Sequence, residues 1–440
     1  AIPPKMPSLL WAATFLSAFR LMTQKKVPIS NFLVVTFTNA SASDMRRKLT
    51  QKLIEREPDE FLLEQISKVS SSDISTLHVF CSKLISTYFY EASVEPNFSV
   101  IDDKQSSLLK DRILTNLFEE KERKVDEDYF ELFEIFQSKR SDKNLRRAIL
   151  RFDNFLKALV SGEKWFNETL NSSYSGDLSK NKCAVIINNY VSGVCSDVAR
   201  EAEELETLCL NFNEQKAYEF LVEISSKFKT IKISNSYFVN AKNLFEISIY
   251  GNAKFEGKNE DLILKVNNFI VDTKDLLKNL KSNMISADEK TLLMGIIQAK
   301  KHIEKLYNLT KEFEESYQNL KREMGVLDFN DLEKYALIIL DNDAIKKAVQ
   351  EKYKYVFVDE YQDINEVQEE IIKRVSSSNN RFMVGDVKQS IYAFRLCNPD
   401  IFIKTYNDYK TSKDAEALKL NTNFRSDKKI LSFVDRVFSS

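Results

Sequence analysis

The sequence predicts an α/β protein whose parallel sheet is interrupted by a large all-helical insertion. Apolar segments of strand length, rich in β-branched and aromatic residues, occur before residue 96 and again after residue 353. The long region between them is rich in Lys, Glu and Leu at helical spacing. Parallel strands are buried on both faces and therefore appear as continuous apolar runs. Two α/β segments that flank a helical block are typical of a helical domain inserted into a sheet domain.

The composition is that of a globular protein with more than one domain. The chain has 440 residues, of which 43% are hydrophobic and 29% are charged, and it is too long for one compact core. The formal net charge is −1, so nucleic-acid binding would need a local basic surface. Five cysteines without a CxxC pair and only two histidines argue against a zinc site and favour a reducing, cytoplasmic location. No apolar run reaches the length of a membrane span.

The first α/β segment begins with an apolar run, Leu9–Phe19, that has the length of a signal-peptide core. Arg20 follows it directly and no small-x-small cleavage site is present. We therefore expect a buried helix over Leu9–Met22.

Strands and helices alternate in the rest of this segment. Residues 31–38 form a β-branched and aromatic run that predicts a buried strand, and Asn39–Ile54 continues with helical spacing. Ser75–Phe80 predicts a second short strand, which is followed by a helix through Tyr90.

Long helices are expected from about residue 96 to residue 343. Glu201–Phe220 and Lys300–Met324 have helical spacing, and the Ser- and Asn-rich stretch Asn171–Asn181 is typical of a loop. Strands return near the end of the chain, and we expect them at Tyr355–Val358, Arg381–Val384 and Ala417–Leu420.

A strand that ends in two acidic residues is the main indication of function. Residues 353–358 (YKYVFV) lead directly into Asp359 and Glu360, and a polar turn, YQD, follows. A bare Asp-Glu pair after a strand is usually a solvated turn. Here the buried strand favours a Walker B motif, in which Asp359 coordinates Mg²⁺ through solvent and Glu360 orients and deprotonates the attacking water.

A second motif follows at residues 384–395 (VGDVKQSIYAFR). Gln389 comes after the end of a strand and is suited to sensing a γ-phosphate. Tyr392 and Phe394 could stack on unpaired bases, because every base presents a π-face. Two isolated aromatic residues would more often belong to a core, and the neighbouring Walker B strand gives base stacking its weight.

A third motif, LNTNFRS (420–426), places Arg425 after a predicted strand. A lone Arg in that position is usually a surface residue. An Arg that meets phosphates across a cleft would instead stabilise charge in the transition state. Spacing alone leaves both interpretations open.

Together these motifs resemble those of the superfamily 1A helicases of the UvrD/Rep/RecB group, and within it the AddA (RexA) subunits of helicase–nucleases. Three further stretches favour the AddA type: residues 94–103, 317–337 and 396–406. Residues from about 110 to 310 carry no motif that we can name. The segments similar to motifs Ia, Ib, II, III and the start of IV are VVTFTNASASDMRRKL (34–49), ISTLHVFCSKLI (74–85), VFVDEYQDINEVQEEII (356–372), VGDVKQSIYAFR (384–395) and LNTNFRS (420–426).

The resemblance implies a RecA-like P-loop NTPase domain that uses ATP and Mg²⁺ and moves along single-stranded DNA. It implies that Asp359 and Glu360 serve Mg²⁺ and water activation, and that Gln389 and Arg425 contact the γ-phosphate. His78 would lie near the DNA backbone, although a histidine within the core is the ordinary interpretation without the family match. The other residues expected at DNA are Thr36, Phe37, Thr38, Asn39, Tyr392, Phe394 and Arg395.

One part of the family pattern is missing from the sequence. The family's P-loop, AxAGSGKT, is expected before the first strand, where this chain has AIPPKMPSLLW (1–11). No GxxxxGK[ST] occurs, and the first glycine is Gly162. A phosphate cradle needs glycines so that backbone N–H groups converge on the anion, whereas the three prolines here lack that donor. Lys5 and Ser8 are weak candidates for remnants.

Three explanations are open for this departure: an altered or missing N-terminus, a degenerate paralogue that binds DNA without hydrolysing ATP, or misassigned N-terminal residues. The chain also stops just after motif IV begins, so we expect an N-terminal fragment that does not unwind DNA alone. The predicted domains are residues 1–95 and 344–411 for the two parts of RecA-like domain 1A, 96–343 for a 1B-like helical insertion, and 412–440 for the start of domain 2A.

The leading hypothesis is an ATP-dependent 3′–5′ DNA helicase, an AddA-like subunit that acts on single-stranded and duplex DNA in double-strand-break repair and recombination. An AddB-like nuclease subunit is the expected partner, and no membrane is involved. The alternatives are a non-catalytic DNA-binding subunit whose ATP site has decayed, and a plain UvrD/Rep-type repair helicase.

Overall fold

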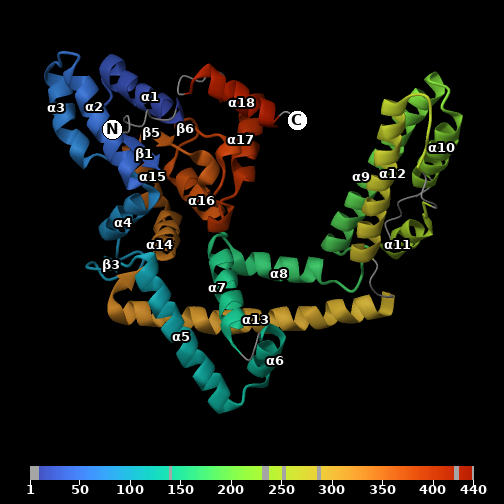
Figure 1. Ribbon diagram of the computed structural model, residues 1–440. Coiled ribbons are helices and arrows are strands. Elements are labelled where there is room, and N and C mark those ends of the chain that lie inside the picture. The colour runs from blue at the N-terminus through green and yellow to red at the C-terminus, as the bar shows by residue number, and fades with distance from the viewer. Residues whose placement is uncertain are drawn as a thin grey trace. The chain divides into compact units, whose positions relative to one another are not determined.

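The computed structural model describes residues 9–137, 141–229, 237–249, 254–284, 289–420 and 426–438. The chain divides into two units, which we describe separately (Figure 1). Unit 1 comprises Ala1–Gly162 and Leu309–Ser440, and unit 2 comprises Glu163–Asn308.

Unit 1 contains a four-stranded parallel sheet with the strand order β2-β1-β5-β6. The register pairs Val34 with Ile74, Leu33 with Val356, and Phe357 with Phe382. The sheet therefore joins residues from both predicted α/β segments, which confirms that the helical region interrupts one sheet. The strands are β1 (Phe32–Thr36), β2 (Ile74–Thr76), β5 (Tyr355–Val358) and β6 (Arg381–Met383).

Alternate residues of β1 point to opposite faces of the sheet, and helices cover both faces. Phe32 and Val34 belong to one apolar core with residues of α1, α2 and α3. Leu33 and Val35 belong to a second core with residues of α4, α14, α15 and α16. The helices are α1 (Leu9–Lys25), α2 (Asn39–Ile54), α3 (Glu60–Lys68), α4 (Leu77–Thr87), α14 (Phe329–Asp341), α15 (Asp343–Lys352) and α16 (Glu366–Val375).

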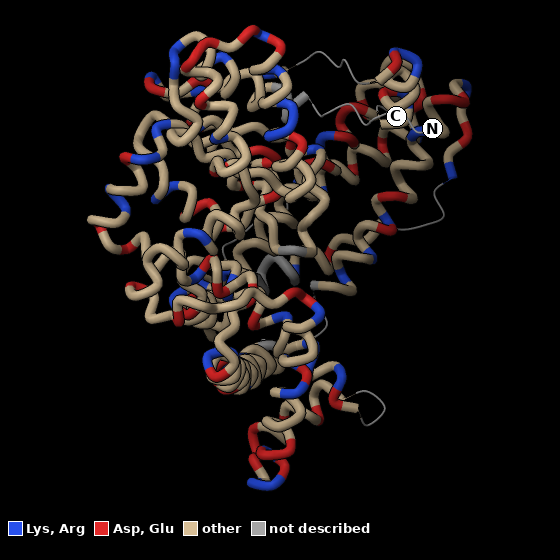
Figure 2. Tube along the Cα trace, turned by 90° about the vertical axis from the view of Figure 1, so that its left-hand side faces the viewer, with Lys and Arg blue, Asp and Glu red and all other residues tan. Residues whose placement is uncertain are grey.

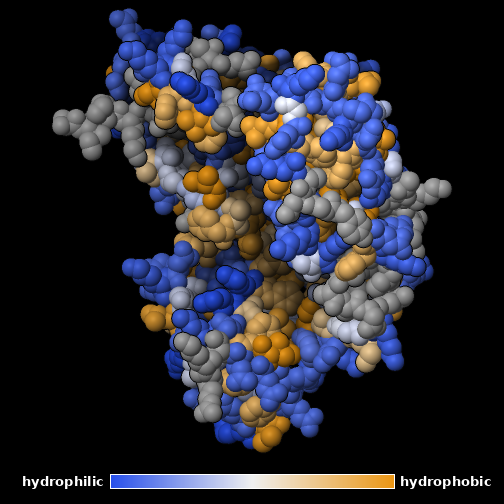
Figure 3. Space-filling model, turned by 45° about the vertical axis from the view of Figure 1, so that its right-hand side comes forward, coloured by the Kyte–Doolittle hydropathy of each residue, from blue (hydrophilic) through white to orange (hydrophobic). Residues whose placement is uncertain are grey.

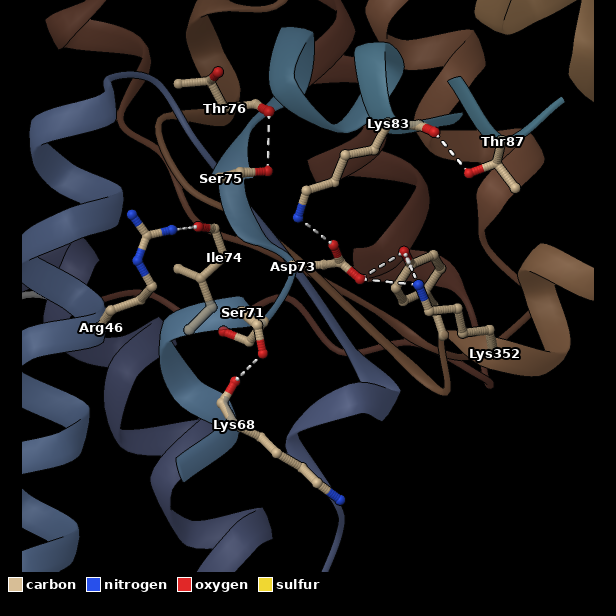
Figure 4. A network of polar contacts seen from close by, with 12 residues as sticks. Arg46, Lys68, Ser71, Asp73, Ile74, Ser75, Thr76, Lys83, Thr87 and Lys352 are labelled. Carbon is tan, nitrogen blue, oxygen red and sulfur yellow. Dashed lines mark hydrogen bonds and ion pairs between the residues drawn. The ribbon is translucent and has the colours of Figure 1, made fainter. Parts of the chain in front are cut away.

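Asp73, immediately before β2, anchors this edge strand to its neighbours (Figure 4). Its carboxylate accepts hydrogen bonds from Lys83 Nζ at 2.9 Å, Lys352 Nζ at 3.0 Å and the Tyr353 hydroxyl at 2.9 Å. Burial opposes ionisation of Asp73, but these hydrogen bonds and the Lys352 charge outweigh it and lower the pKa. The start of β2 is thus tied to α4 and to the end of α15.

A second, two-stranded parallel sheet lies in unit 1, where the sequence predicted only helices. β3 (Ser99–Val100) pairs with β4 (Val326–Leu327). Gly325, at the end of α13, has φ +62°, a conformation that favours glycine, and its carbonyl accepts the Ser99 N–H at 3.1 Å. The segments on either side are α5 (Asp103–Lys124), α6 (Glu127–Phe136), α7 (Lys143–Lys157) and α13 (Glu289–Met324).

A buried ionic cluster fixes the end of α13 against the start of α14. Lys321 is 1% exposed, and its Nζ donates to Asp328 Oδ2 at 3.1 Å and to Asp331 Oδ2 at 2.5 Å. The same ammonium lies 4.3 Å from the centroid of the buried Tyr317 ring. Both carboxylates are therefore paired inside the protein, as buried charges require.

Unit 2 is helical in its described residues. α9 (Lys182–Asn211) and α10 (Gln215–Lys229) pack against each other, and α11 (Tyr237–Glu246) and α12 (Glu260–Met284) complete a shared apolar core. α8 (Gly162–Ser173) precedes them and ends before the Asn171–Asn181 loop is complete, so the predicted loop begins later, after Ser173.

Three predicted elements are wrong in detail. The strand predicted at Ser75–Phe80 ends at Thr76, whose side chain caps α4, so the next residues are helical. The helix predicted at Glu201–Phe220 breaks after α9, because Asn213 adopts φ 55°. Ala417–Leu420 forms no strand, since no described segment pairs with its backbone. The last helices are α17 (Pro399–Thr411) and α18 (Lys428–Phe438).

Charged residues of both signs alternate along most of the chain (Figure 2). The surface in Figure 3 is largely hydrophilic and is interrupted by apolar patches. α1 is a buried helix as predicted, with Phe15, Ala18 and Met22 in the core. None of the helices in the described ranges combines the length and the apolar character needed to cross a bilayer.

Candidate nucleotide site and nucleic-acid surface

The segments that follow β1, β5 and β6 meet at one edge of the sheet, because parallel neighbours end on the same side. The Asp359 N–H donates to Val35 O at 3.0 Å, and the Val384 N–H donates to Val358 O at 2.9 Å. The Tyr361 N–H donates to Val384 O at 3.0 Å. Ligands of open α/β sheets bind beyond the carboxyl ends of the strands. The three predicted motifs are thus brought to the edge where such a site is expected.

Asp359 is a buried carboxylate that is only partly satisfied. Its side chain is in a residue only 6% exposed, and Oδ1 has no hydrogen-bond partner among the described residues. Burial, with a further contribution from the Glu360 charge, raises the pKa of Asp359 to about 6. A carboxylate with a raised pKa and an unsatisfied oxygen is suited to receive a cation or a donor from a ligand.

Glu360 lies beside Asp359 in a left-handed backbone conformation, with φ 53°. A non-glycine residue in this region of φ/ψ space is uncommon, and such strain is often found at functional sites. The Glu360 carboxylate Oε2 accepts a hydrogen bond from Gln362 Nε2 at 2.8 Å. The carboxylate is therefore held in place by a side chain two residues further along.

Gln362 also connects this turn to the segment after β6. Its side chain is buried, and its Oε1 accepts the Asp386 N–H at 2.9 Å. A Cβ atom on Gly385 would lie 2.6 Å from that oxygen, so the close approach depends on the glycine. The Asp359–Asp363 turn and the Gly385–Gln389 loop are consequently linked through one amide.

Gln389, predicted to contact the γ-phosphate, is exposed in a short 3₁₀ helix, Val387–Gln389. Its Nε2 donates to Asp386 Oδ2 at 3.0 Å. Asp386 Oδ1 in turn accepts the Lys388 N–H at 3.0 Å. The Gln389 amide is thus oriented by Asp386, which is itself held by Gln362.

A second buried carboxylate, Asp363, closes the same turn. Burial and the Glu360 charge outweigh the hydrogen bonds from Gln362 and Ser390 and raise the pKa of Asp363. Its Oδ1 also lacks a partner in the part of the chain that the structure describes. These acidic residues do not form a metal cage, since the described residues hold no group of three or more ligands arranged for a metal.

The donor set nevertheless fits Mg²⁺ as a nucleotide-bound ion. Mg²⁺ prefers oxygen ligands and is commonly held by one or two carboxylates together with phosphates and waters. Asp359 supplies an unsatisfied carboxylate oxygen of this kind. Glu360 lies next to it and could take part through a bound water.

Three aromatic rings form a continuous row beside this edge. The centroids of Phe37 and Tyr392 are 4.8 Å apart, and those of Tyr392 and Phe394 are 5.8 Å apart. Phe394 is 76% exposed, whereas Phe37 and Tyr392 are half-buried. Phe37 follows β1 and the other two rings follow β6, so the fold assembles this row from two motifs far apart in sequence.

The polar residues beside Phe37 differ in exposure. Thr36 is 3% exposed, and its hydroxyl donates to Thr38 O at 3.1 Å, so its side chain shapes the turn rather than the surface. Thr38 and Asn39 are exposed at the start of α2, where the Thr38 hydroxyl accepts the Ser41 N–H at 3.1 Å. An exposed helix N-terminus of this kind offers backbone donors to an anion.

His78 is partly exposed near the start of α4, with 34% of its side chain accessible. Its Nε2 lies 3.1 Å from Oε1 of Glu333, which is on α14. The imidazole ring also lies 4.9 Å, between centroids, from the ring of Phe329. It is therefore neither a fully buried core residue nor free of the core.

Two other predicted residues cannot be placed. Arg425, like Lys5 and Ser8, lies outside the described residues. Arg395 ends a 3₁₀ helix, Ala393–Arg395, and its backbone alone is described.

Sequence reasoning overlooked the residues that hold the predicted ones. Gln362, Asp363, Asp386 and Glu333 were given no role, although the first two stand within the YQD turn. A buried polar residue next to a predicted catalytic acid was the available signal for Gln362 and Asp363. Glu333 is distant in sequence from both residues it contacts, and no local pattern indicates it.

The sequence profile of the UvrD/REP helicase N-terminal domain matches residues 16–410. The chain therefore belongs to the UvrD/REP helicase family, which confirms the resemblance seen in its motifs.

Curated relatives of this chain are named as the AddA subunit of an ATP-dependent helicase/nuclease. The protein of Carboxydothermus hydrogenoformans is 32% identical over 426 residues, covering 94% of this chain and 36% of the relative. The Listeria monocytogenes serotype 4b protein is 32% identical over 438 residues, covering 93% of this chain and 35% of the relative. The Syntrophomonas wolfei protein is 30% identical over 438 residues, with 95% and 35% covered. The chain thus spans about a third of the length of the curated relatives it matches.

Proposed function

We propose that this chain is the ATP-hydrolysing part of an AddA-type DNA helicase subunit, which moves 3′–5′ along single-stranded DNA. The observation that carries the proposal is the Asp359–Glu360 pair at the carboxyl edge of a parallel sheet. One amide, that of Gln362, links the pair to the Gln389 loop. The family membership and the relatives' name support the same interpretation.

Each residue of the pair has a separate role in this proposal. Asp359 holds Mg²⁺, partly through water, and the ion would neutralise charge on the nucleotide phosphates. Glu360 accepts a proton from the attacking water, and the hydrogen bond from Gln362 keeps its carboxylate oriented. Gln389 reaches the γ-phosphate from the neighbouring loop, and Arg425 is proposed to meet the same phosphate.

DNA binds along the surface formed by the segments after β1 and β6 in this proposal. Phe37, Tyr392 and Phe394 stack on bases, while the exposed start of α2 and His78 meet the phosphate backbone. Stacking on aromatic rings tolerates any base, so this surface would bind single-stranded DNA without sequence preference. The remaining proposed contact is Arg395.

The wider assignment is proposed from the family. Residues 1–95 and 344–411 form RecA-like domain 1A, residues 96–343 form a 1B-like insertion, and residues 412–440 begin domain 2A. The partner is an AddB-like nuclease subunit, the location is the cytoplasm, and the process is double-strand-break repair and recombination.

The test is the DNA-stimulated ATPase of the intact gene product and of its Glu360→Gln variant. Loss of a general base lowers the rate by about 100-fold or more, while binding of Mg²⁺–ATP and of oligothymidylate should persist. Glu366→Gln, an exposed carboxylate on α16, is the matched control and should hydrolyse ATP like the wild type. Equal rates in wild type and Glu360→Gln would show that Glu360 is not the base.

A second candidate function is a non-catalytic DNA-binding subunit. It is favoured by the absence of GxxxxGK[ST] from the sequence. Calorimetry of the intact gene product with ATP separates the two candidates, because tight Mg²⁺-dependent binding would exclude a decayed site. A plain UvrD/Rep-type helicase is the third candidate, and the complete reading frame decides it by whether a nuclease domain is encoded.

A further inference from the structure

Glu333, on α14, contacts both the predicted DNA surface and the helix that follows the acidic pair. Its residue is only 4% exposed, and its Oε1 lies 3.1 Å from His78 Nε2 and 2.7 Å from Gln368 Nε2. His78 lies on α4 and Gln368 on α16, so one carboxylate oxygen joins side chains from three helices. No role in the proposed mechanism accounts for this arrangement.

The hydrogen-bond directions follow from the neighbouring contacts. Gln368 Oε1 accepts the Asn365 N–H, and its backbone N–H donates to Asn365 Oδ1 at 2.8 Å, which forms a capping box at the start of α16. The Gln368 amide nitrogen therefore faces Glu333 and donates to it. A carboxylate can only accept, so His78 Nε2 carries a proton, and Nδ1 is the ring nitrogen left to meet a ligand.

Glu333 has no Lys or Arg partner in the ion pairs of the described residues, and His78 is its one possible counter-ion there. A buried carboxylate without a cation is costly, and a protonated His78 would offset that cost. A DNA phosphate that approaches the partly exposed imidazole would compete with Glu333 for the same positive charge. The Glu333–His78 contact is thus sensitive to what binds at His78.

The other arm of Glu333 leads back to the acidic pair. Asn365 begins α16 and is five residues after Glu360 in sequence. The connecting turn is constrained, since the Asp363 N–H donates to Glu360 O at 2.9 Å and the Asn398 N–H donates to Ile364 O at 2.9 Å. A change in how Glu333 holds Gln368 is therefore transmitted through a short, ordered segment.

We propose that Glu333 is a positioning residue that couples occupation of the DNA surface at His78 to the orientation of Glu360. This inference rests on the proposed function, because it needs a DNA-stimulated ATPase. Glu333 touches neither substrate in the proposal and acts through His78 on one side and through Gln368 on the other. The simpler alternative is that Glu333 only fastens α14 to α4 and α16.

The experiment compares wild type with Glu333→Gln in the intact gene product. The readout is the ratio of the ATPase rate with saturating oligothymidylate to the rate without DNA. Loss of hydrogen bonds to a charged group corresponds to about a tenfold effect, and the ratio should fall by about that factor. Glu351→Gln, the same substitution at an exposed position on α15, is the matched control and should keep the wild-type ratio.

A second variant tests the α16 arm without altering the carboxylate. Gln368→Met keeps the side-chain length but removes the donor to Glu333, and the ratio should fall as in Glu333→Gln. If both variants lower the two rates in parallel and leave the ratio unchanged, Glu333 is only a packing residue and the proposal is overturned. A wild-type ratio in Glu333→Gln overturns it as well.

The same data separate this proposal from the proposed function. A wild type that DNA stimulates, with variants that behave like Glu351→Gln, refutes the coupling and leaves the helicase assignment intact. A wild type whose ATPase does not respond to DNA refutes the helicase assignment, and the coupling with it.

Discussion

Replacing Asp359 with Asn is expected to stabilise the folded protein at neutral pH while it removes the proposed cation ligand. Asp359 is a buried residue whose pKa is raised from 3.8 to about 6. The folded state therefore binds the Asp359 proton more tightly than the unfolded state does. The stability that comes from this proton is complete below about pH 4 and is lost as the pH rises through about 6.

The magnitude follows from the two pKa values. Each factor of ten in proton affinity corresponds to about 1.4 kcal/mol, so the ionised Asp359 destabilises the fold by about 3 kcal/mol at neutral pH. Asn has the same shape and no charge, so Asp359→Asn should recover at most this amount. The recovery will be smaller to the extent that the new amide lacks partners, because a buried amide also needs hydrogen bonds.

Thermal unfolding of wild type and Asp359→Asn measures this difference. For a cooperative unit with the size of unit 1, about 3 kcal/mol corresponds to a rise in Tm of about 5 °C. The rise should be present at pH 7.5 and should disappear near pH 4, where Asp359 is protonated in both states. Mg²⁺–nucleotide should stabilise the wild type more than the variant, which narrows the difference.

Two outcomes would contradict the reasoning. A variant less stable than wild type at pH 7.5 would mean that the Asp359 carboxylate has favourable partners in the folded state. A stabilisation of equal size at pH 4 and pH 7.5 would mean that its origin is not the charge.

Two further predictions concern the aromatic row and the buried ionic cluster. Phe394→Ala should weaken oligothymidylate binding about tenfold in a fluorescence anisotropy titration, since stacking on one base contributes about 1–3 kcal/mol; Ile391→Ala, at a similarly exposed apolar residue, should bind like wild type, and equal losses in both would argue against stacking. Lys321→Met should lower the free energy of unfolding by about 3–5 kcal/mol at neutral pH, because it leaves Asp328 and Asp331 buried without a cation. The triple variant K321M/D328N/D331N should recover most of that loss in the same denaturation assay, and no recovery would mean that packing dominates.

The main elements of the sheet could be predicted because their signals are local. The run at residues 31–38 contains β1, and Asn39–Ile54 is α2 with the predicted bounds. Tyr355–Val358 is β5 as predicted. An apolar run of strand length and a helical period are properties of adjacent residues, so they survive whatever the rest of the chain does.

The errors occur where the outcome depends on distant residues. β3 exists because Ser99 pairs with Val326, and two-residue strands have no pattern of their own. The strand expected at Ala417–Leu420 has suitable residues, yet no described segment pairs with it. A strand is defined by hydrogen bonds to a neighbour, and the sequence of one segment does not say whether that neighbour is present.

The sequence by itself determined the family, the order of the motifs and the acidic pair that ends β5. It did so because these signals are carried by residue types at fixed short spacings. The tertiary structure alone decided that Gln362 holds Glu360 and the Asp386 loop together, that Thr36 is buried, and that Glu333 joins His78 to Gln368. These contacts depend on which segments the fold brings side by side, and burial then determines the protonation of Asp359.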